Sequence, residues 1–291
     1  MRHSFIGAIA AAALMSSAWM PAARAQQPAP RPATIGGHPN FNGIWQALNT
    51  AYWNLEAHNA EALDAFWGMG AIAAIPAGKS VVRGGTIPYR TEALQKRNQY
   101  RANWPADDPE AKCWMLGVPR VTYHNMPFQI FQGEADADLL MVYPFAATNR
   151  IIYMKDHSEP AVDTYMGKSM GSWDGKTLVV TTIGQNDKTW LDRAGNFHSN
   201  QLKVTERFML LDADHIHYEA TLEDPETYTR PWTMEMPLYR LIDDNVQLLE
   251  HKCVPFADKF LYSDLLHLTP PAKPAMPAPS PVGPPPPPRN R

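Results

Sequence analysis

The residues with the most chemical potential lie in one polar and aromatic segment, residues 186–200 (NDKTWLDRAGNFHSN). Asp192 can orient the imidazole of His198, which would then act as a base, while Arg193 stabilises developing negative charge. A loop of about 15 residues in a compact domain usually carries function or is disordered, and aromatic side chains disfavour disorder. A self-packed lid whose aspartate caps a turn accounts for the same residues equally well.

A second carboxylate, Glu206, lies in an otherwise apolar row of a predicted strand, residues 202–211. Alternate residues of a strand share a face, and an isolated buried carboxylate is costly unless it is paired or protonated. Glu206 is therefore either salt-bridged to a core arginine, such as Arg150 or Arg240, or an acid with a raised pKa. Arg207 faces the opposite way, so it can act beside Glu206 only if a bulge interrupts the strand. The catalytic hypothesis comprises His198 as base, Asp192 as its orienter, Glu206 as acid or second base, and Arg207 or Arg193 as anion stabiliser.

Aromatic and polar residues of two loops are candidate ligand contacts. The second loop, residues 223–233, contains an acidic cluster and two prolines, and its aromatic residues can line a pocket mouth. A purely structural turn suits that segment better. The predicted ligand-binding residues are Trp190, Asn186, Arg193, Tyr228 and Trp232.

Two further motifs have surroundings that disfavour the chemistry they suggest. Residues 167–171 read Gly-Lys-Ser-Met-Gly, the pattern of a nucleophile elbow, but that elbow needs a following helix and a hairpin follows here. The side chains of His215, His217, Glu219 and Glu223 share one face of a predicted strand, as in some metal sites, but the other face is apolar and should form the core. We therefore predict no metal site and no cofactor.

Composition and charge exclude some classes of partner. The chain has 26 Lys and Arg against 29 Asp and Glu, a net charge of −3, which offers no basic surface for nucleic acid. Residues 1–25 have the charged start, short apolar run and small-residue end of a signal peptide cleaved between Ala25 and Gln26. That run is shorter than the roughly 20 residues of a membrane span. Loss of Arg2 and Arg24 on cleavage makes the net charge −5. We expect a periplasmic or secreted protein without a membrane span, whose partner is a small-molecule ligand or substrate.

Proline marks the boundaries of the folded part. Residues 26–35 are predicted to be a Pro/Ala linker, residues 36–268 a single domain, and residues 269–291 a disordered proline-rich tail that acts as a spacer. Within the domain, export favours a disulfide between Cys113 and Cys253 over two separate buried thiols. So long a closed loop would stabilise the fold by roughly 4–5 kcal/mol.

The elements that must position these residues are mostly short strands with turns between them. Predicted strands cover residues 128–132, 139–143, 150–154, 171–173, 177–183, 202–211, 215–222, 232–241 and 246–250. Their spacing without intervening helices indicates an antiparallel barrel or sandwich. Trp45, in a Gly-x-Trp at the start of an earlier strand, favours a lipocalin-like barrel in which this tryptophan closes one end beneath an arginine such as Arg240.

The first third of the domain departs from this pattern. Residues 80–82 and 86–89 flank two glycines and predict a hairpin. Residues 54–69 and 91–104 have helical composition, with Thr91 as a cap of the second helix and Pro105 after its end. The prediction is a mainly β protein, an antiparallel barrel-like (lipocalin-like) meander with a small helical N-terminal insert.

Several longer runs resemble a family of exported bacterial proteins. The similar runs are residues 108–120 (DPEAKCWMLGVPR), 166–180 (MGKSMGSWDGKTLVV), 189–207 (TWLDRAGNFHSNQLKVTER), 223–233 (EDPETYTRPWT), and MPLYR with LLEHKC in residues 236–253. The resemblance covers nearly the whole core and implies a common fold, but it supplies no established reaction. It includes the positions of Trp190, Asp192, Gly195, His198, Glu206, Arg207, Cys113 and Cys253, whereas His215, His217 and the pair His124-Asn125 depart from it.

Two functions remain open from the sequence. The first is a cofactor-independent enzyme of the lyase, dehydratase, hydratase or isomerase type, acting on a small, partly hydrophobic molecule in a barrel cavity. The second is a non-catalytic lipocalin-like protein that binds or carries an apolar ligand, with Glu206 salt-bridged and inert. An adaptor role in the cell envelope through the proline-rich tail is a weaker third.

Overall fold

The computed structural model describes residues 31–63 and 74–257, so the predicted signal peptide, the predicted tail and residues 26–30 of the predicted linker lie outside the described residues. The chain divides into two units at Pro32 and Ala33, and all elements below belong to the second. Two short strands, β1 (Thr34–Ile35) and β2 (His38–Pro39), pair with each other before the barrel begins.

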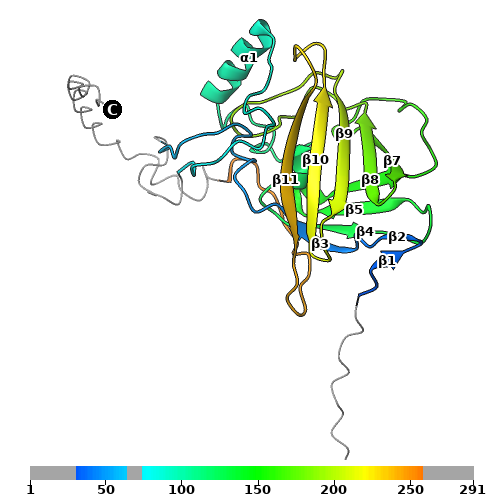
Figure 1. Cartoon of the computed structure of the whole chain (residues 1–291). Helices are drawn as coiled ribbons and strands as arrows, with labels where there is room; N and C mark the ends of the chain where they lie inside the picture. The colour runs from blue at the N-terminus through cyan, green and yellow to red at the C-terminus, as the bar shows by residue number, and fades with distance from the viewer. Residues whose placement is uncertain (1–30, 64–73, 258–291) are drawn as a thin grey trace, which may run out of the picture. The chain divides into compact units, whose positions relative to one another are not determined.

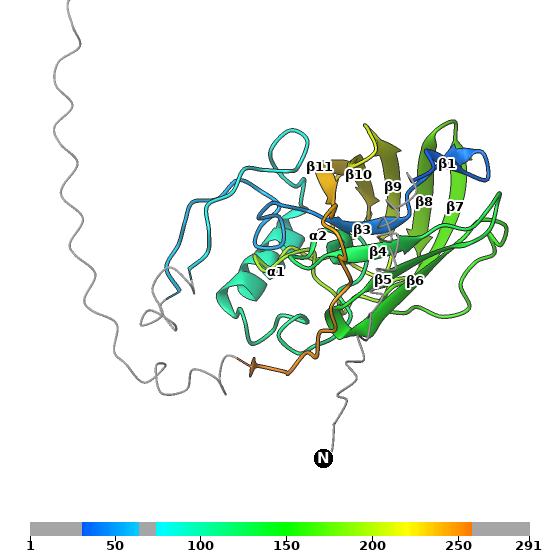
Figure 2. The ribbon, with the colours of Figure 1, turned by 90° about the horizontal axis from the view of Figure 1, so that it is seen from below.

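Nine strands close into a barrel in the order β10-β11-β3-β4-β5-β6-β7-β8-β9, with β9 paired to β10 (Figures 1 and 2). They are β3 (Gly43–Gln46), β4 (Phe128–Phe131), β5 (Leu139–Tyr143), β6 (Thr148–Tyr153), β7 (Lys168–Asp174), β8 (Thr177–Ile183), β9 (Lys203–Leu210), β10 (His215–Glu223) and β11 (Trp232–Arg240). The predicted mainly β, barrel-like class is confirmed.

One pair of neighbours, β6 and β7, is parallel, and the other neighbouring pairs are antiparallel. Because an odd number of strands cannot alternate in direction all the way round a closed barrel, one parallel pair is required. Residues 154–167 make the necessary return from one end of the barrel to the other. The serine of the elbow-like motif, Ser169, lies within β7 and not on a strand-to-helix turn.

Hydrophobic alternation explains which face of each strand is inside. On β10, Ile216, Tyr218, Ala220 and Leu222 are buried, whereas the histidines and glutamates between them are partly exposed. The matching row of β9 holds Val204, Glu206 and Phe208, all fully buried. The face predicted to be the core is therefore the core, and a single carboxylate interrupts it.

One end of the barrel is closed as predicted. The guanidinium carbon of Arg240 lies 4.0 Å from the centre of the Trp45 ring, and the indole N–H donates to the Phe41 carbonyl at 2.8 Å. Gly43 gives the space for this arrangement, since a Cβ there would lie 2.2 Å from Nη1 of Arg240. A stacked cation over indole adds to the hydrophobic closure of this end.

The long connection between β3 and β4 lies toward the opposite end, where β10 finishes (Figure 1). It carries α1 (Thr91–Ala102) and the single-turn α2 (Arg120–Tyr123), and a 3₁₀ turn (Phe145–Ala147) joins β5 to β6. The loops before β9 and before β11 reach the same end, because β8 and β10 both run toward it. This end therefore collects the polar loops singled out in the sequence.

Several local predictions for this connection are wrong. Residues 80–89 form no hairpin: Val82 pairs with Met234 and Tyr89 with Tyr228. No helix lies in residues 54–63, where tertiary pairing and the hydrogen bond of the Leu55 N–H to Asp192 override helical composition, and residues 64–69 lie outside the described residues.

Two boundary predictions are wrong as well. The helix α1 begins at Thr91, but Arg90 occupies the N-cap position and no side chain caps the helix. Residues 246–250 form no strand and have no ladder partner. The chain that follows is linked to the insert by the disulfide at Cys253.

Candidate functional site

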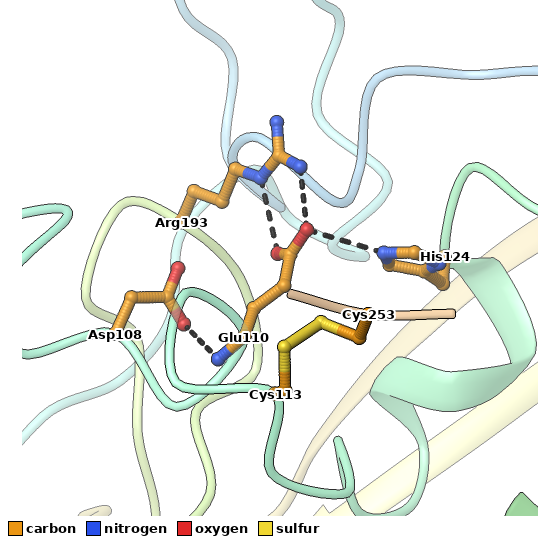
Figure 3. The surroundings of a disulfide bond; sticks show 6 residues. All are labelled: Asp108, Glu110, Cys113, His124, Arg193 and Cys253. Carbon is orange, nitrogen blue, oxygen red and sulfur yellow. Dashed lines mark hydrogen bonds and ion pairs between the residues drawn. A yellow bond between two sulfur atoms is a disulfide. The ribbon is translucent and has the colours of Figure 1, made fainter. Parts of the chain in front are cut away.

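Five ionisable residues gather beside the disulfide at the insert-covered end of the barrel, and we call them the end cluster. Its members are Asp108, Glu110, Arg120, His124 and Arg193. Cys113 and Cys253 form the predicted disulfide, with an S–S distance of 1.98 Å and a Cα–Cα distance of 5.7 Å. Figure 3 shows that this bond ties the C-terminal segment against the same group of side chains.

Glu110 is the centre of the cluster (Figure 3). Arg193 donates to both of its carboxylate oxygens, from Nε at 3.0 Å and from Nη2 at 2.5 Å. Arg120 donates to Oε2, and Nε2 of His124 lies 3.2 Å from Oε1. Each carboxylate oxygen of Glu110 therefore has two partners, which is the arrangement of a strongly held, ionised carboxylate.

Asp108 is equally saturated. Its Oδ1 accepts from Arg120 Nη1 at 3.0 Å and from the backbone N–H of Glu110 at 2.9 Å. Its Oδ2 accepts from Arg120 Nη2 at 3.3 Å and from Trp104 Nε1 at 3.1 Å. Arg120 is fully buried, and it joins the two carboxylates and offsets their charge.

Electrostatics keep the cluster ionised but leave its histidine neutral. Burial alone raises the pKa of Glu110, but Arg193 and Arg120 outweigh it and hold that pKa well below the usual range. Burial disfavours the charged forms of Arg120 and Arg193, and their carboxylate partners outweigh it, so both pKa values are raised. Burial lowers the pKa of His124, and its Nδ1 has no hydrogen-bond partner among the described residues.

A pocket of about 480 Å³, which we call the disulfide pocket, opens against this cluster. Its wall includes Trp104, Phe145, Arg193, His251, Lys252 and Phe256, together with Asp108, Glu110 and Cys253. A smaller pocket of about 230 Å³ shares Trp104 and Arg193 with it. Arg193 also lies over two aromatic rings, with its guanidinium carbon 5.0 Å from the Tyr52 ring centre and 4.4 Å from that of Trp53.

The predicted acid–base pair is not in contact. Asp192 accepts the backbone N–H groups of Leu55 at 2.9 Å, Ala194 at 2.9 Å and Asn196 at 3.2 Å, in addition to the amide of Asn196 at 2.6 Å. Its pKa is raised by burial. Among the described residues, none of its hydrogen bonds goes to His198. This is the geometry of an aspartate that caps turns.

His198 is bonded through both ring nitrogens. Its Nε2 lies 2.6 Å from the Thr189 hydroxyl and its Nδ1 lies 2.8 Å from the Ser199 carbonyl. It is almost fully buried, and burial lowers its pKa. A neutral imidazole that is a donor at Nδ1 and an acceptor at Nε2 satisfies both contacts.

Glu206 and Arg207 lie on opposite sides of β9, as alternation predicts. Inside the barrel, Arg150 forms a two-point ion pair with Glu206, and Tyr218 donates to Glu206 Oε1 at 2.8 Å. Arg150 also donates to Ser169 at 2.8 Å and to Thr182 at 2.9 Å. Outside, Arg207 pairs with Asp174 at 2.8 Å, with 41% of its side chain exposed. The two residues therefore face different environments.

Of the predicted ligand contacts, Arg193 lines both pockets. Trp190 is buried in a separate aromatic cluster, 4.8 Å from the ring of Tyr100. Tyr228 and Trp232 are buried in the main core, with their ring centres 5.5 Å apart. Asn186 is partly exposed, and its N–H donates to the Thr164 carbonyl at 2.8 Å.

The sequence reasoning missed four members of the end cluster. Asp108 and Glu110 lie a few residues before Cys113, and a disulfide prediction could have directed attention to them. Arg120 and His124 carry no comparable signal, because they lie in a single-turn helix and directly after it. Their ion pairs with Asp108 and Glu110 join residues of the same connection, whereas the bond of Glu110 to Arg193 forms only when the loop before β9 meets that connection.

One further group of potential metal ligands lies on the outer face of the barrel. Ligand atoms of His217, Glu219 and Glu235 lie within 4.8 Å of one another. The Nη2 of Arg83 already bridges the two carboxylates, at 2.7 Å from Glu219 and 2.6 Å from Glu235. An arginine cation thus holds the position that a metal ion would take between them.

The chain matches no protein-family model, no curated protein and no solved structure. The resemblance to a family of exported bacterial proteins therefore stays a prediction. In the part of the chain that the structure describes, no helix has the length and apolar character to cross a membrane.

Proposed function

We propose that this is an exported protein that binds a small, partly apolar molecule in the disulfide pocket. The observation that carries the proposal is the composition of that pocket: about 480 Å³, lined mostly by aromatic and aliphatic residues together with a few charged ones, of which Arg193 is one. Binding sites for small molecules combine a mostly apolar cavity with a few polar groups that orient the ligand.

Export is supported by the disulfide between Cys113 and Cys253, since such bonds persist in oxidising compartments. The bond also joins the two walls of the pocket, residues 104–111 and 251–257. The N–H of Phe256 also donates to the Ala111 carbonyl at 2.9 Å between these segments. A binding site held in this way depends on its disulfide.

A binding function suits the predicted catalytic residues better than catalysis does. His198, Asp192 and Glu206 are each almost or fully buried, with their polar atoms bonded to protein groups. A general acid or base must reach the proton that it transfers. The salt-bridged state of Glu206 is the one expected for a binding protein.

The test uses N-phenyl-1-naphthylamine, a neutral apolar probe whose fluorescence rises in an apolar site. We expect saturable binding to the mature protein and loss of binding in Ala111→Trp, which fills the disulfide pocket. The matched control Ala62→Trp places the same side chain in the smaller pocket and should leave binding intact. Equal binding to the wild type and Ala111→Trp, or no binding at all, would overturn the proposal.

The second candidate is an enzyme of the lyase, hydratase or isomerase type, and one observation favours it. Burial lowers the pKa of His124, which favours the neutral imidazole, and if its Nε2–H donates to Glu110, its Nδ1 is left without a partner among the described residues. Because that nitrogen is buried, it can act as a base only on a substrate that reaches it from the end of the barrel. Incubation of the wild type, His124→Gln and His198→Ala with culture metabolites, followed by mass spectrometry, tests this. Conversion by the wild type but not by His124→Gln supports the enzyme, and an unchanged metabolite profile refutes it.

A further inference from the structure

Among the described residues, the charged side chains that line the disulfide pocket offer hydrogen-bond donors but no free acceptors. Both oxygens of Asp108 and both oxygens of Glu110 already have two partners each. A carboxylate oxygen with two partners has little capacity left for a ligand donor. A ligand that presents N–H or ammonium groups therefore finds no strong partner on this wall.

Arg193, in contrast to the two carboxylates, has hydrogen-bonding capacity left. It uses one edge of its guanidinium, Nε and Nη2, on Glu110, and its Nη1 makes no hydrogen bond to any described residue. Figure 3 shows one terminal nitrogen of Arg193 pointing away from Glu110. A guanidinium has a second two-nitrogen edge, Nη1 and Nη2, which matches the two oxygens of a carboxylate.

The charge balance of the wall also favours an anion. Asp108 and Glu110 are offset by Arg120 and Arg193, so these four residues sum to zero. Lys252 lines the same pocket, is exposed, and forms no ion pair within the described chain. One positive charge is thus left over, and it can offset the charge of an incoming anion beside Arg193.

The remaining wall selects the body of the ligand. Phe145 and His251 stack with ring centres 5.8 Å apart, and Trp104 and Phe256 complete an aromatic lining. Flat rings pack well on such surfaces. Resting on the binding function proposed above, we propose that the ligand is an aromatic carboxylic acid, with its carboxylate on the Nη1–Nη2 edge of Arg193 and its ring against Phe145 and His251.

The test is displacement of the same neutral probe by 2-naphthoate and by 2-naphthamide, which differ only in carrying a carboxylate or an uncharged amide. Charge-assisted bonds to Arg193 should let naphthoate displace the probe at about tenfold lower concentration than naphthamide. In Lys252→Met and in Arg193→Met this preference should fall below about threefold, the loss of one charged contact. The dissociation constant of the probe is measured separately in each variant, so that the two competitors are compared as inhibition constants within the same variant.

The matched control is Lys176→Met, which removes an exposed lysine from the β7–β8 turn at the other end of the barrel and should keep the full preference. Because Arg193→Met also removes a partner of Glu110, the near-ultraviolet circular dichroism spectrum of this variant must match that of the wild type. If the spectrum differs, the test rests on Lys252→Met alone. Equal potency of the two competitors, or preference retained in both variants, would overturn the carboxylate inference. Absence of probe binding would instead refute the binding function itself.

Discussion

Two buried arginine–carboxylate groups in the described part of the chain, Arg150–Glu206 and the cluster around Glu110, differ in what surrounds them. Inside the barrel, Arg150 and Glu206 are enclosed by strands, and Tyr218, Ser169 and Thr182 occupy their remaining hydrogen-bonding positions. At the insert-covered end, the cluster around Glu110 borders a pocket, and Arg193 keeps 20% of its side chain exposed. The same type of ion pair is thus enclosed by protein in the barrel interior and accessible from a pocket at the insert-covered end.

The difference shows how to separate a structural ion pair from a recognition site. In the interior, the polar side chains satisfy one another, and burial together with the charge of Glu206 raises the pKa of Tyr218 well above its ordinary value. At the end, the carboxylates are saturated, while Nη1 of Arg193, a residue of the pocket wall, has no hydrogen-bond partner among the described residues. Unused polar capacity beside a cavity, rather than buried charge as such, indicates where a ligand binds.

The largest expected effect is on the interior pair. Glu206→Ala leaves Arg150 charged and enclosed, so we expect the free energy of unfolding to fall by about 3–5 kcal/mol. Urea unfolding followed by circular dichroism measures it. The double change Arg150→Met/Glu206→Leu removes both charges and should lose less than the single one. A loss below about 1 kcal/mol in Glu206→Ala would show that water reaches this pair.

The corresponding change at the end should cost less. In Glu110→Ala, Arg120 keeps Asp108 as a partner and Arg193 can turn toward water. We expect a loss of about 1–3 kcal/mol, the range for a charged hydrogen-bond partner that is removed. The same urea experiment compares it directly with Glu206→Ala. A loss equal to that of Glu206→Ala would contradict the distinction between a closed and an open cluster.

A smaller effect should appear when the pH is lowered. Burial lowers the pKa values of His124 and His198 below their ordinary 6.5, so the unfolded chain binds protons more readily than the folded one just below that pH. The stability is complete above pH 6.5 and falls as the pH drops below it, by at most about 1.4 kcal/mol per histidine for each pH unit. Urea midpoints at pH 7.5 and 5.5 measure this.

The variants His124→Gln and His198→Gln assign that pH dependence to the two residues. Each should flatten the change in stability between pH 7.5 and 5.5, because one group that titrates on unfolding is removed. A variant that leaves the dependence unchanged shows that its histidine already accepts a proton in the folded state. For His124, that result would remove the neutral base on which the enzymatic alternative depends.

The sequence predicted the barrel better than the site, for a physical reason. Alternation along β9 and β10 is local, and it placed Glu206 inside and Arg207 outside correctly. The Trp45–Arg240 contact joins residues that are distant in the sequence, but the Gly-x-Trp pattern of lipocalin-like barrels predicts it. The end cluster has no such pattern, because Glu110, His124 and Arg193 are brought together by the insert and the loop before β9.

The same limit explains the misassigned acid–base pair. Asp192 and His198 are close in the sequence, and their side-chain types suggested a direct bond. In the fold, the backbone N–H groups of the turn and of Leu55 donate to the carboxylate of Asp192. The imidazole of His198 is hydrogen-bonded to Thr189 and Ser199. Proximity along the chain does not decide which of several nearby groups a buried side chain will bond to.

The smallest effect should come from Arg207, the predicted anion stabiliser on the outer face of β9. It and Asp174 are 41% and 68% exposed, and exposed pairs contribute about 0.2–1 kcal/mol. The free energy of unfolding of Arg207→Ala should therefore lie within about 1 kcal/mol of the wild-type value. Naphthoate should displace the neutral probe from this variant with the same preference over naphthamide as in the wild type. Arg207 and Glu206 are adjacent in the chain but lie on opposite faces of β9. A small loss of unfolding free energy in Arg207→Ala, beside a large loss in Glu206→Ala, would show that the face of the strand decides the environment of each residue. A reduced naphthoate preference in Arg207→Ala would move the ligand from the insert-covered end to the outer face of the sheet.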